Sequence, residues 1–429
     1  MYYNFVSLSG IPAILTVAWI FSSDRRNFHW RIVIFGILIQ MVIAIIIFRL
    51  PEAPYLFQLF NNAFNHLLGV VNKATIFIFG RISIPPGQTG TNGETSLGFS
   101  LAFQAFPTII FFSAIVAVLY HFCIMQWFIN IFSRFFMGFL KISGAESFCS
   151  ASNIFVGVES YITIRPFILK MTESELFTIL TAGMATIASS VLGLYVLILH
   201  KEFPDIAGHL LSASLLSAPA AVMISKIMCP EKGHPVTSGI HPRIETDKKN
   251  NVMEAVMDGA TAGVSLIVNI VAMLIAFISL TALINLFLTG LGNHINEIMD
   301  LNLDWSLEGL LGYIFYPFTI MMGVPSNDAF HISKLLGERL ILTEVKSFQD
   351  LAVLIGRGCL NNQRSVIIAS YALCGFSHIA SLAIFIGGAA SIAPGRKKDL
   401  SRLGLKALFA SNLACLLTGA IAGLFCVTD

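Results

Sequence analysis

The feature that most constrains this chain is the recurrence of apolar stretches about as long as a bilayer is thick. A helix needs roughly 20 mostly apolar residues to cross the hydrocarbon core. Eight stretches meet that requirement: residues 4–21, 32–50, 101–122, 172–200, 207–228, 264–288, 364–391 and 402–426. The sequence therefore predicts an all-α polytopic membrane protein with eight transmembrane helices, whose surroundings are a lipid bilayer.

The composition agrees with a membrane domain and excludes several other classes. Hydrophobic residues make up 56% of the chain and charged residues 12%, against about 25% charged residues in soluble proteins. The net charge is +2 and no long basic tract occurs, so nucleic acid is not an expected partner. The 7 cysteines form no CxxC pair, which argues against a metal site or a disulfide framework.

Basic residues in three short loops predict the orientation. They follow the first stretch (Arg25, Arg26, Arg31), the fifth (Lys226, Lys232, Arg243, Lys248, Lys249) and the seventh (Arg396, Lys397, Lys398, Arg402). Loops rich in Lys and Arg lie in the cytoplasm, and alternation puts all three on one side. Both termini are therefore expected outside.

Four segments do not fit simple spans. Residues 55–82 are amphipathic and are expected at the membrane interface. Residues 144–168 and 333–352 are too polar and interrupted to span. Polar backbone at membrane depth is tolerated only where protein or water surrounds it, so both are predicted to be re-entrant hairpins. The run 306–323, which contains Pro317, is compatible with a broken helix or with part of the second hairpin region.

The order of these elements repeats. A hairpin, an interrupted span and a plain span occur at 144–228 and again at 333–426, and the span count makes the second copy inverted. Inverted repeats with paired broken segments indicate a transporter binding site near the bilayer midplane. We expect four regions: scaffold spans with the interfacial helix (1–125), a first transport repeat (126–228), a cytoplasmic loop with a scaffold span (229–300) and a second transport repeat (301–429).

Each predicted hairpin carries one acid near its middle, Glu159 and Glu344. A carboxylate at the bilayer centre costs roughly 2.5–3.5 kcal/mol on insertion scales, so each needs a compensating role. One interpretation is hydrogen bonding to substrate hydroxyls or coupling to an ion. The other is a structural role, as an ion pair with Arg165 or Arg339 or through simple access to water.

Small and polar residues interrupt the fourth and seventh spans. They are Thr186, Ser189, Ser190 and Gly193 in the fourth, and Gly375, Ser377, His378 and Ser381 in the seventh. Unwound backbone at such places offers carbonyls to a cation and amides to a polar ligand. The alternatives are close helix packing for the hydroxyl residues and a satisfied core position for His378.

Four motifs resemble the concentrative nucleoside transporters in order and spacing. They are GFSLAFQAFPTIIFFSAIVAVLY, ESFCSASNIFVG, ATIASSVLGLY and SYALCGFSHIAS, and the resemblance covers most of residues 98–391. It implies a homotrimer, an elevator-like transport domain, and symport driven by sodium or protons, with no other cofactor.

The resemblance assigns site residues position by position. The family's first hairpin reads N-x-F-x-G-Q-T-E; here Asn153 and Gly157 match, Val158 replaces the Gln, and the acid comes one residue early as Glu159. In the family's C-G-F-A-N-x-x-S, His378 stands in place of the Asn. The implied substrate residues are Gly157, Val158, Glu159, Ser160, Glu344, Phe376, His378 and Ser381, and the implied ion residues are Asn153, Val156, Thr186 and Ile187.

We therefore expect an ion-coupled importer of nucleosides in a bacterial cytoplasmic membrane. The departures at Val158, Glu159 and His378 keep open a transporter of another small polar metabolite. An enzyme is disfavoured because HExxH, GxSxG and Cys/His ligand spacings do not occur. A channel is disfavoured because paired inverted hairpins are typical of alternating access. Oxygen donors at Asn153 and Thr186 favour sodium, a hard cation, over protons.

Overall fold

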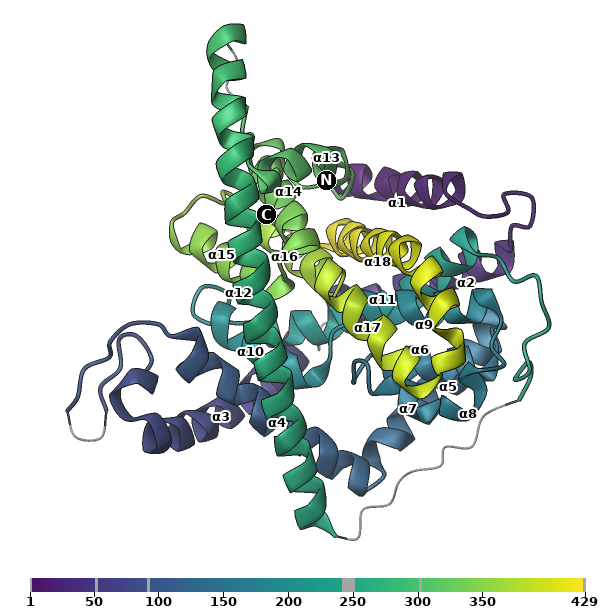
Figure 1. Cartoon of the computed structure of the whole chain (residues 1–429), viewed down its shortest axis with the longest axis horizontal. Helices are drawn as coiled ribbons and strands as arrows, with labels where there is room; N and C mark the ends of the chain where they lie inside the picture. Colours follow the sequence, from purple (N-terminus) through teal and green to yellow (C-terminus); the bar gives the residue numbers. More distant parts are fainter. Residues whose placement is uncertain (1, 51–52, 91–92, 241–250, 301–302, 427–429) are drawn as a thin grey trace.

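The computed structural model describes residues 2–50, 53–90, 93–240, 251–300 and 303–426. These residues form helices joined by loops and short turns, with no β-strand among them (Figure 1). The predicted all-α membrane fold is confirmed.

Seven helical stretches of the described chain are long and apolar enough to cross a bilayer. They are α1 (Tyr2–Ile20), α2 (Trp30–Arg49), η2 with α4 (Leu101–Ala105, Phe106–His121), α9 with α10 (Glu173–Ala185, Ser189–Leu199), α11 (Ile206–Met228), α12 (Val252–Met299), and η3 with α18 (Pro394–Arg396, Lys397–Phe425). Each coincides with a predicted apolar stretch. The remaining prediction, 364–391, contains two shorter helices, α16 (Gln363–Leu373) and α17 (Ile379–Ile392).

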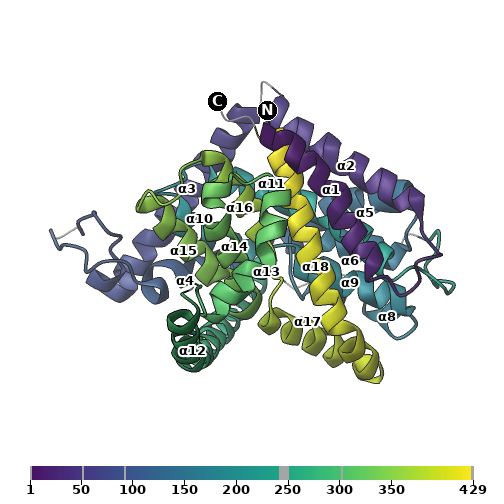
Figure 2. The ribbon, with the colours of Figure 1, turned by 90° about the horizontal axis from the view of Figure 1, so that it is seen from above.

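Helix α12 is far longer than the predicted 264–288. Its 48 residues extend about 72 Å at 1.5 Å per residue, and Figure 1 shows it running past the rest of the chain like a rod. Figure 2 shows it end-on at the rim. Gly259 and Gly263 let it approach α4 closely, because a Cβ on Gly263 would lie 2.7 Å from the Ile110 Cα.

Three further helices lie outside these stretches. Helix α3 (Ala53–Phe79), followed by η1 (Gly80–Ser83), matches the amphipathic segment. Helix α5 (Ile124–Leu140) was not predicted; it buries one face, including Ile129 and Phe136. Helix α13 (Leu307–Met321) continues through Pro317. It packs on α14, where Gly312 lies against Lys334, so 306–323 is a separate helix ahead of the second hairpin.

Both predicted hairpins contain helices too short to span a bilayer, three in the first and two in the second. The first comprises α6 (Gly144–Ser152), α7 (Ser160–Thr163) and α8 (Arg165–Ile168); the second comprises α14 (Ser326–Ile341) and α15 (Glu344–Gly356). Helix α6 begins with a capping box in which Ser143 and Glu146 satisfy each other's backbone amides. The second hairpin begins before the predicted residue 333, because the polar run after Pro325 is the first turn of α14.

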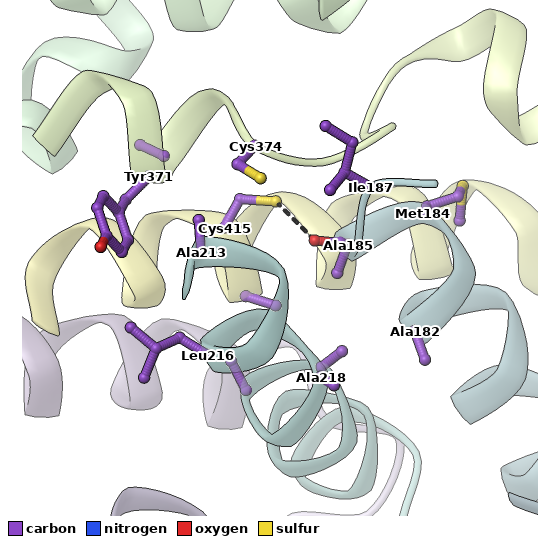
Figure 3. Packing of buried hydrophobic residues seen from close by; sticks show 14 of the residues in the cluster. Ala182, Met184, Ala185, Ile187, Ala213, Leu216, Ala218, Tyr371, Cys374 and Cys415 are labelled. Atoms are coloured by element: carbon purple, nitrogen blue, oxygen red, sulfur yellow. Dashed lines mark hydrogen bonds between the residues drawn. The ribbon is translucent and has the colours of Figure 1, made fainter. Parts of the chain in front are cut away.

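The breaks in the two interrupted spans meet in the interior. The first break is 186–188 and the second is 374–378. The Phe376 amide donates to the Thr186 carbonyl at 3.4 Å, and Ser377 Oγ donates to the Met184 carbonyl at 2.9 Å. Figure 3 shows Cys415 of α18 beneath this crossing, directed at the Ala185 carbonyl. Of the positions that the sequence singled out, Thr186, Gly375, Ser377 and His378 lie in the breaks, whereas Ser189, Ser190, Gly193 and Ser381 lie within the helices that follow.

The first and last helices lie side by side. Asn4 Nδ2 donates to the Leu424 carbonyl at 2.9 Å. The buried guanidinium of Arg364 donates to the carbonyls of Gly423 and Cys426 at 2.6 and 3.1 Å and to Ser7 Oγ at 2.9 Å. One arginine of α16 thus joins residues from both ends of the described chain (Figures 1 and 2).

Candidate functional site

A cavity opens where the two hairpin tips, the two breaks and α12 come together. Its lining includes all but one of the predicted substrate residues: Gly157, Val158, Glu159, Glu344, Phe376, His378 and Ser381. The predicted residues thus come from three separate segments and converge on one space. Ser160 is the exception and does not line the cavity.

Glu344 is the first residue of α15 and is only 4% exposed. Its Oε1 accepts a hydrogen bond from the Tyr195 hydroxyl at 2.6 Å, and its Oε2 lies 2.6 Å from His378 Nε2. A carboxylate at a helix N-terminus is also stabilised by the helix dipole. The buried acid is therefore compensated from three directions, and the alternative of an ion pair with Arg339 is wrong.

His378 is the N-cap of α17. Its Nδ1 accepts from the Ser381 amide at 3.2 Å, so the proton of the neutral ring is on Nε2. That nitrogen lies 2.7 Å from Ser381 Oγ and faces Glu344. The imidazole thus does two things: it caps a half-helix and places Nε2 at ion-pair distance from the buried carboxylate.

Glu159 occupies the other part of the cavity and is exposed to it. Its Oε2 lies 3.5 Å from the position of a Cβ on Gly157, and the ring edge of Phe376 lies 4.0 Å from the same point. Within the described residues the carboxylate has no hydrogen-bond or ion-pair partner. The alternative of an ion pair with Arg165 is therefore also wrong.

Helix α12 contributes one wall that the sequence did not predict. Leu266, Asn269, Ile270 and Met273 line the cavity. Only Asn269 carried a signal, as the single polar side chain in the run LIVNIVAM. The polar parts of the cavity are thus Glu344 with His378 and Ser381 on one side, and Glu159 and Asn269 elsewhere on the wall.

The predicted ion residues lie at the first hairpin tip and the first break. The Ser189 amide donates to the Phe155 carbonyl at 2.8 Å, which joins the two segments. In the described structure the carbonyls of Val156 and Ile187 accept no hydrogen bond. Neutral oxygens of this kind suit a hard monovalent cation, whereas the described residues hold no cluster of three or more His, Cys, Asp or Glu for a transition metal.

The side chains at this place are already organised. Asn153 is fully buried, and its Oδ1 accepts from Ser160 Oγ at 2.9 Å. Thr186 Oγ1 donates to the Ala182 carbonyl at 2.9 Å, which leaves its lone pairs free. Ser160 therefore orients the amide of Asn153 and does not face the cavity.

Three protein-family models match the chain. "Na+ dependent nucleoside transporter N-terminus" covers residues 9–82, "Nucleoside recognition" covers 102–202, and "Na+ dependent nucleoside transporter C-terminus" covers 209–423. The chain belongs to the concentrative nucleoside transporter family. The family indicated by the sequence motifs is thereby confirmed.

Relatives of this family match along most of the chain. Solute carrier family 28 member 3 of Mus musculus is 35% identical over 98% of this chain and 59% of its own length. The chain thus spans about three fifths of that protein. The uncharacterized transporter YutK of Bacillus subtilis is 36% identical over 97% of this chain and 98% of YutK. A structure of CNTnw in an inward-facing substrate-bound state matches with TM-score 0.87 and 31% identity, covering 99% of this chain and 98% of that one.

Membership in the concentrative nucleoside transporter family bears on more than the fold. The family consists of membrane transporters and not of enzymes, and the described chain holds seven helical stretches long and apolar enough to span a bilayer.

Proposed function

We propose that the protein imports nucleosides across a bacterial cytoplasmic membrane by ion-coupled symport with an elevator-like movement. The observation that carries this proposal is the cavity at the meeting of both hairpin tips and both breaks, with a buried carboxylate on its wall. A site built equally from two inverted repeats suits alternating access, because either repeat can open it to one side.

The sugar is assigned to the Glu344 side. A carboxylate is a strong acceptor for hydroxyl donors, and Ser381 Oγ and His378 Nε2 lie beside it. Phe376 offers an apolar surface between the two parts of the cavity. The base is assigned to Gly157, Val158 and Glu159, with Ser160 acting from behind through Asn153.

The coupling ion is assigned to sodium, held by Asn153, Val156, Thr186 and Ile187. Free carbonyls at the tip and the break, one amide oxygen and one hydroxyl oxygen supply a hard donor set. In proteoliposomes, an inward sodium gradient should raise uptake at constant pH. Uptake that ignores sodium and stops when the proton gradient is removed would assign the coupling to protons instead.

The division into moving and fixed parts follows the sequence repeats. Residues 126–228 and 301–429 form the transport repeats, and residues 1–125 and 229–300 form the scaffold of a homotrimer. The exposed apolar side chains of α12, among them Val268, Ile275 and Leu286, suit contact with lipid or a neighbouring subunit. Both termini are assigned to the outside; of the basic loop residues behind this assignment, Arg243, Lys248 and Lys249 lie outside the described residues.

A second candidate substrate is another small polar metabolite. It is favoured by Val158, which cannot hydrogen-bond a base, and by Glu159 and His378, which change the chemistry of the wall. Counterflow in proteoliposomes preloaded with uridine, cytidine, adenosine, guanosine or a sugar separates the two. Exchange with at least one nucleoside supports the proposal, whereas exchange with the sugar alone favours the second candidate.

A further inference from the structure

The first half of each broken span ends as a helix C-terminus in the protein interior, but the two C-termini contact different groups. Helices α9 and α16 both stop at a break, which leaves backbone carbonyls and the negative end of a helix dipole in the interior. In transporters such half-helix C-termini coordinate cations. The question is what each end holds.

At the end of α9 the surroundings are neutral. Its last carbonyls and the following break are contacted by hydroxyl and thiol groups, such as Ser377 Oγ at Met184 and Cys415 Sγ at Ala185. The carbonyls of Val156 and Ile187 accept no bond from the described residues. These two carbonyls can therefore coordinate a dissolved cation. They belong to the ion site of the proposed function.

At the end of α16 a side chain takes that place. Arg339, from the first helix of the second hairpin, is fully buried. Its Nη1 donates to the Ala372 carbonyl in the last turn of α16, and its Nη2 donates to Asn412 Oδ1 at 2.6 Å. The guanidinium thus meets one backbone carbonyl and one amide oxygen, the same kinds of donor that bind a hard cation.

No carboxylate balances this charge in the described part of the chain. The neighbouring acid Glu338 pairs with Lys346 at 3.2 Å, and Glu344 is occupied by Tyr195 and His378. Arginine cannot lose its proton in a protein, and its Nε is buried without a partner among the described residues. A buried charge without a counter-charge is costly, so its retention calls for a function.

Asn412 connects Arg339 to the residues that line the substrate cavity. While its Oδ1 accepts from Arg339, its Nδ2 donates to the Ser377 carbonyl at 3.2 Å. Ser377 lies in the break between Phe376 and His378, both of which line the cavity. The position of the guanidinium is therefore coupled to the position of the sugar-side residues.

We propose that Arg339 is a tethered cation that fills, in the second repeat, the place that a dissolved cation takes in the first. It holds the α16 break in the conformation that binds substrate. Because this end is permanently occupied, the pair of half-helix ends couples one dissolved cation to each transport cycle. The stoichiometry rests on the proposed function, whereas the cation role of Arg339 does not.

The first test separates charge from shape. Arg339→Lys keeps the positive charge. Arg339→Gln keeps a hydrogen-bond donor but removes the charge. The matched control is Arg357→Gln, at an exposed position in the same hairpin. Thermal unfolding in detergent and nucleoside binding are measured for each. We expect Lys to retain most of the wild-type stability and binding, Gln to lose at least about tenfold in binding, and the control to be unchanged. Equal behaviour of Lys and Gln, in either direction, overturns the proposal.

The second test supplies the cation from solution. Arg339→Ala leaves a space that guanidinium can fill, and about 20 mM guanidinium is far below denaturing concentrations. We expect guanidinium to raise the unfolding temperature and restore binding in this variant, while urea, a neutral molecule of the same shape, does not. Rescue by urea as well, or an Arg339→Ala variant with wild-type stability and binding, contradicts a tethered cation. If Arg339→Ala does not fold, the Lys and Gln variants decide.

Sodium dependence tests the stoichiometry separately. Uptake by the wild type should rise with sodium with a Hill coefficient of about 1, and uptake by Arg339→Ala should become steeper, toward about 2, as a second ion enters. A wild-type coefficient near 2 overturns the stoichiometry. If the wild type binds no nucleoside, the proposed function fails, yet the unfolding measurements with guanidinium and urea still test Arg339.

Discussion

The two hairpins each bring one glutamate to the same cavity, and the two acids differ in almost every physical respect. Glu344 is buried and held in place, with a tyrosine hydroxyl hydrogen-bonded to one oxygen and an imidazole nitrogen 2.6 Å from the other. Glu159 is exposed to the cavity and has no partner among the described residues. An acid held in this way is oriented before the ligand arrives, which lowers the entropy lost on binding. An acid without a protein partner can accept hydrogen bonds from donors on the ligand, and it therefore affects which ligand binds.

The largest expected effect comes from removing the oriented charge. Glu344→Gln should weaken nucleoside binding and uptake by roughly 10- to 150-fold, since a hydrogen bond to a charged group is worth about 1.5–3 kcal/mol. The change is measured by isothermal titration and by uptake into proteoliposomes. Glu297→Gln, at a carboxylate that is 78% exposed on α12, is the control. Wild-type affinity in Glu344→Gln would remove the sugar-side assignment.

A smaller effect should follow when the acid is kept but its orientation is lost. Tyr195→Phe deletes the hydroxyl that holds Oε1, while the ring keeps its contact with Phe348 at a centroid distance of 4.7 Å. We expect binding to weaken by about tenfold, within the range for one charge-assisted hydrogen bond. Tyr161→Phe is the matched control, because that buried hydroxyl lies 3.5 Å from the Ile179 carbonyl and outside the cavity lining. Equal losses in both variants would point to packing instead.

The free acid should act on preference more than on overall binding. Glu159→Gln exchanges an acceptor-only group for one that also donates. Guanosine and cytidine, whose bases present amino donors, should lose about tenfold relative to uridine, which lacks an amino group. Competition against labelled uridine measures the ranking, with each nucleoside serving as the control for the others. An unchanged ranking would show that Glu159 does not face the base.

The smallest effect concerns His378. His378→Asn removes the ring nitrogen that lies 2.6 Å from Glu344 Oε2 but should still cap α17, since Asn is a good N-cap. We expect nucleoside binding to weaken by a few-fold with an unchanged unfolding temperature, measured by isothermal titration and thermal unfolding. Wild-type binding in His378→Asn would leave His378 only its capping role.

Much of this arrangement could be predicted because it depends on local chemistry. Apolar length predicted the long helices, and polar residues within apolar runs predicted the breaks at Thr186 and at Gly375–His378. The acids of the hairpins were notable because an uncompensated charge in a membrane is costly. These signals can be recognised without knowing which residues lie nearby in the folded structure.

Other features depended on neighbours and could not be predicted from the chain alone. Helix α5 was missed because its 17 residues are shorter than a span and include Gln126, Asn130 and Arg134 among the apolar side chains. The wall from α12 depends on which face Gly259 and Gly263 press against α4. One alternative paired Arg339 with an acid; its partner is a helix terminus, which leaves no trace in a charge pattern.

The contact between the two ends of the chain also has a consequence for biosynthesis. Asn4 bonds to the Leu424 carbonyl across 420 residues. Arg364 likewise bonds to the carbonyls of Gly423 and Cys426, which are synthesised after it. At about 5–20 residues per second of translation, roughly 20–80 s separate the insertion of α1 from the arrival of its partner. During that interval Asn4 lacks the Leu424 carbonyl, whereas Arg364 lacks the carbonyls of Gly423 and Cys426 only for the roughly 3–12 s that 59–62 residues take. Helix α1 also packs on α13, where Ser7 Oγ donates to the Met322 carbonyl at 2.8 Å. The last turn of α18 therefore adds late contacts to a first helix that already has native neighbours.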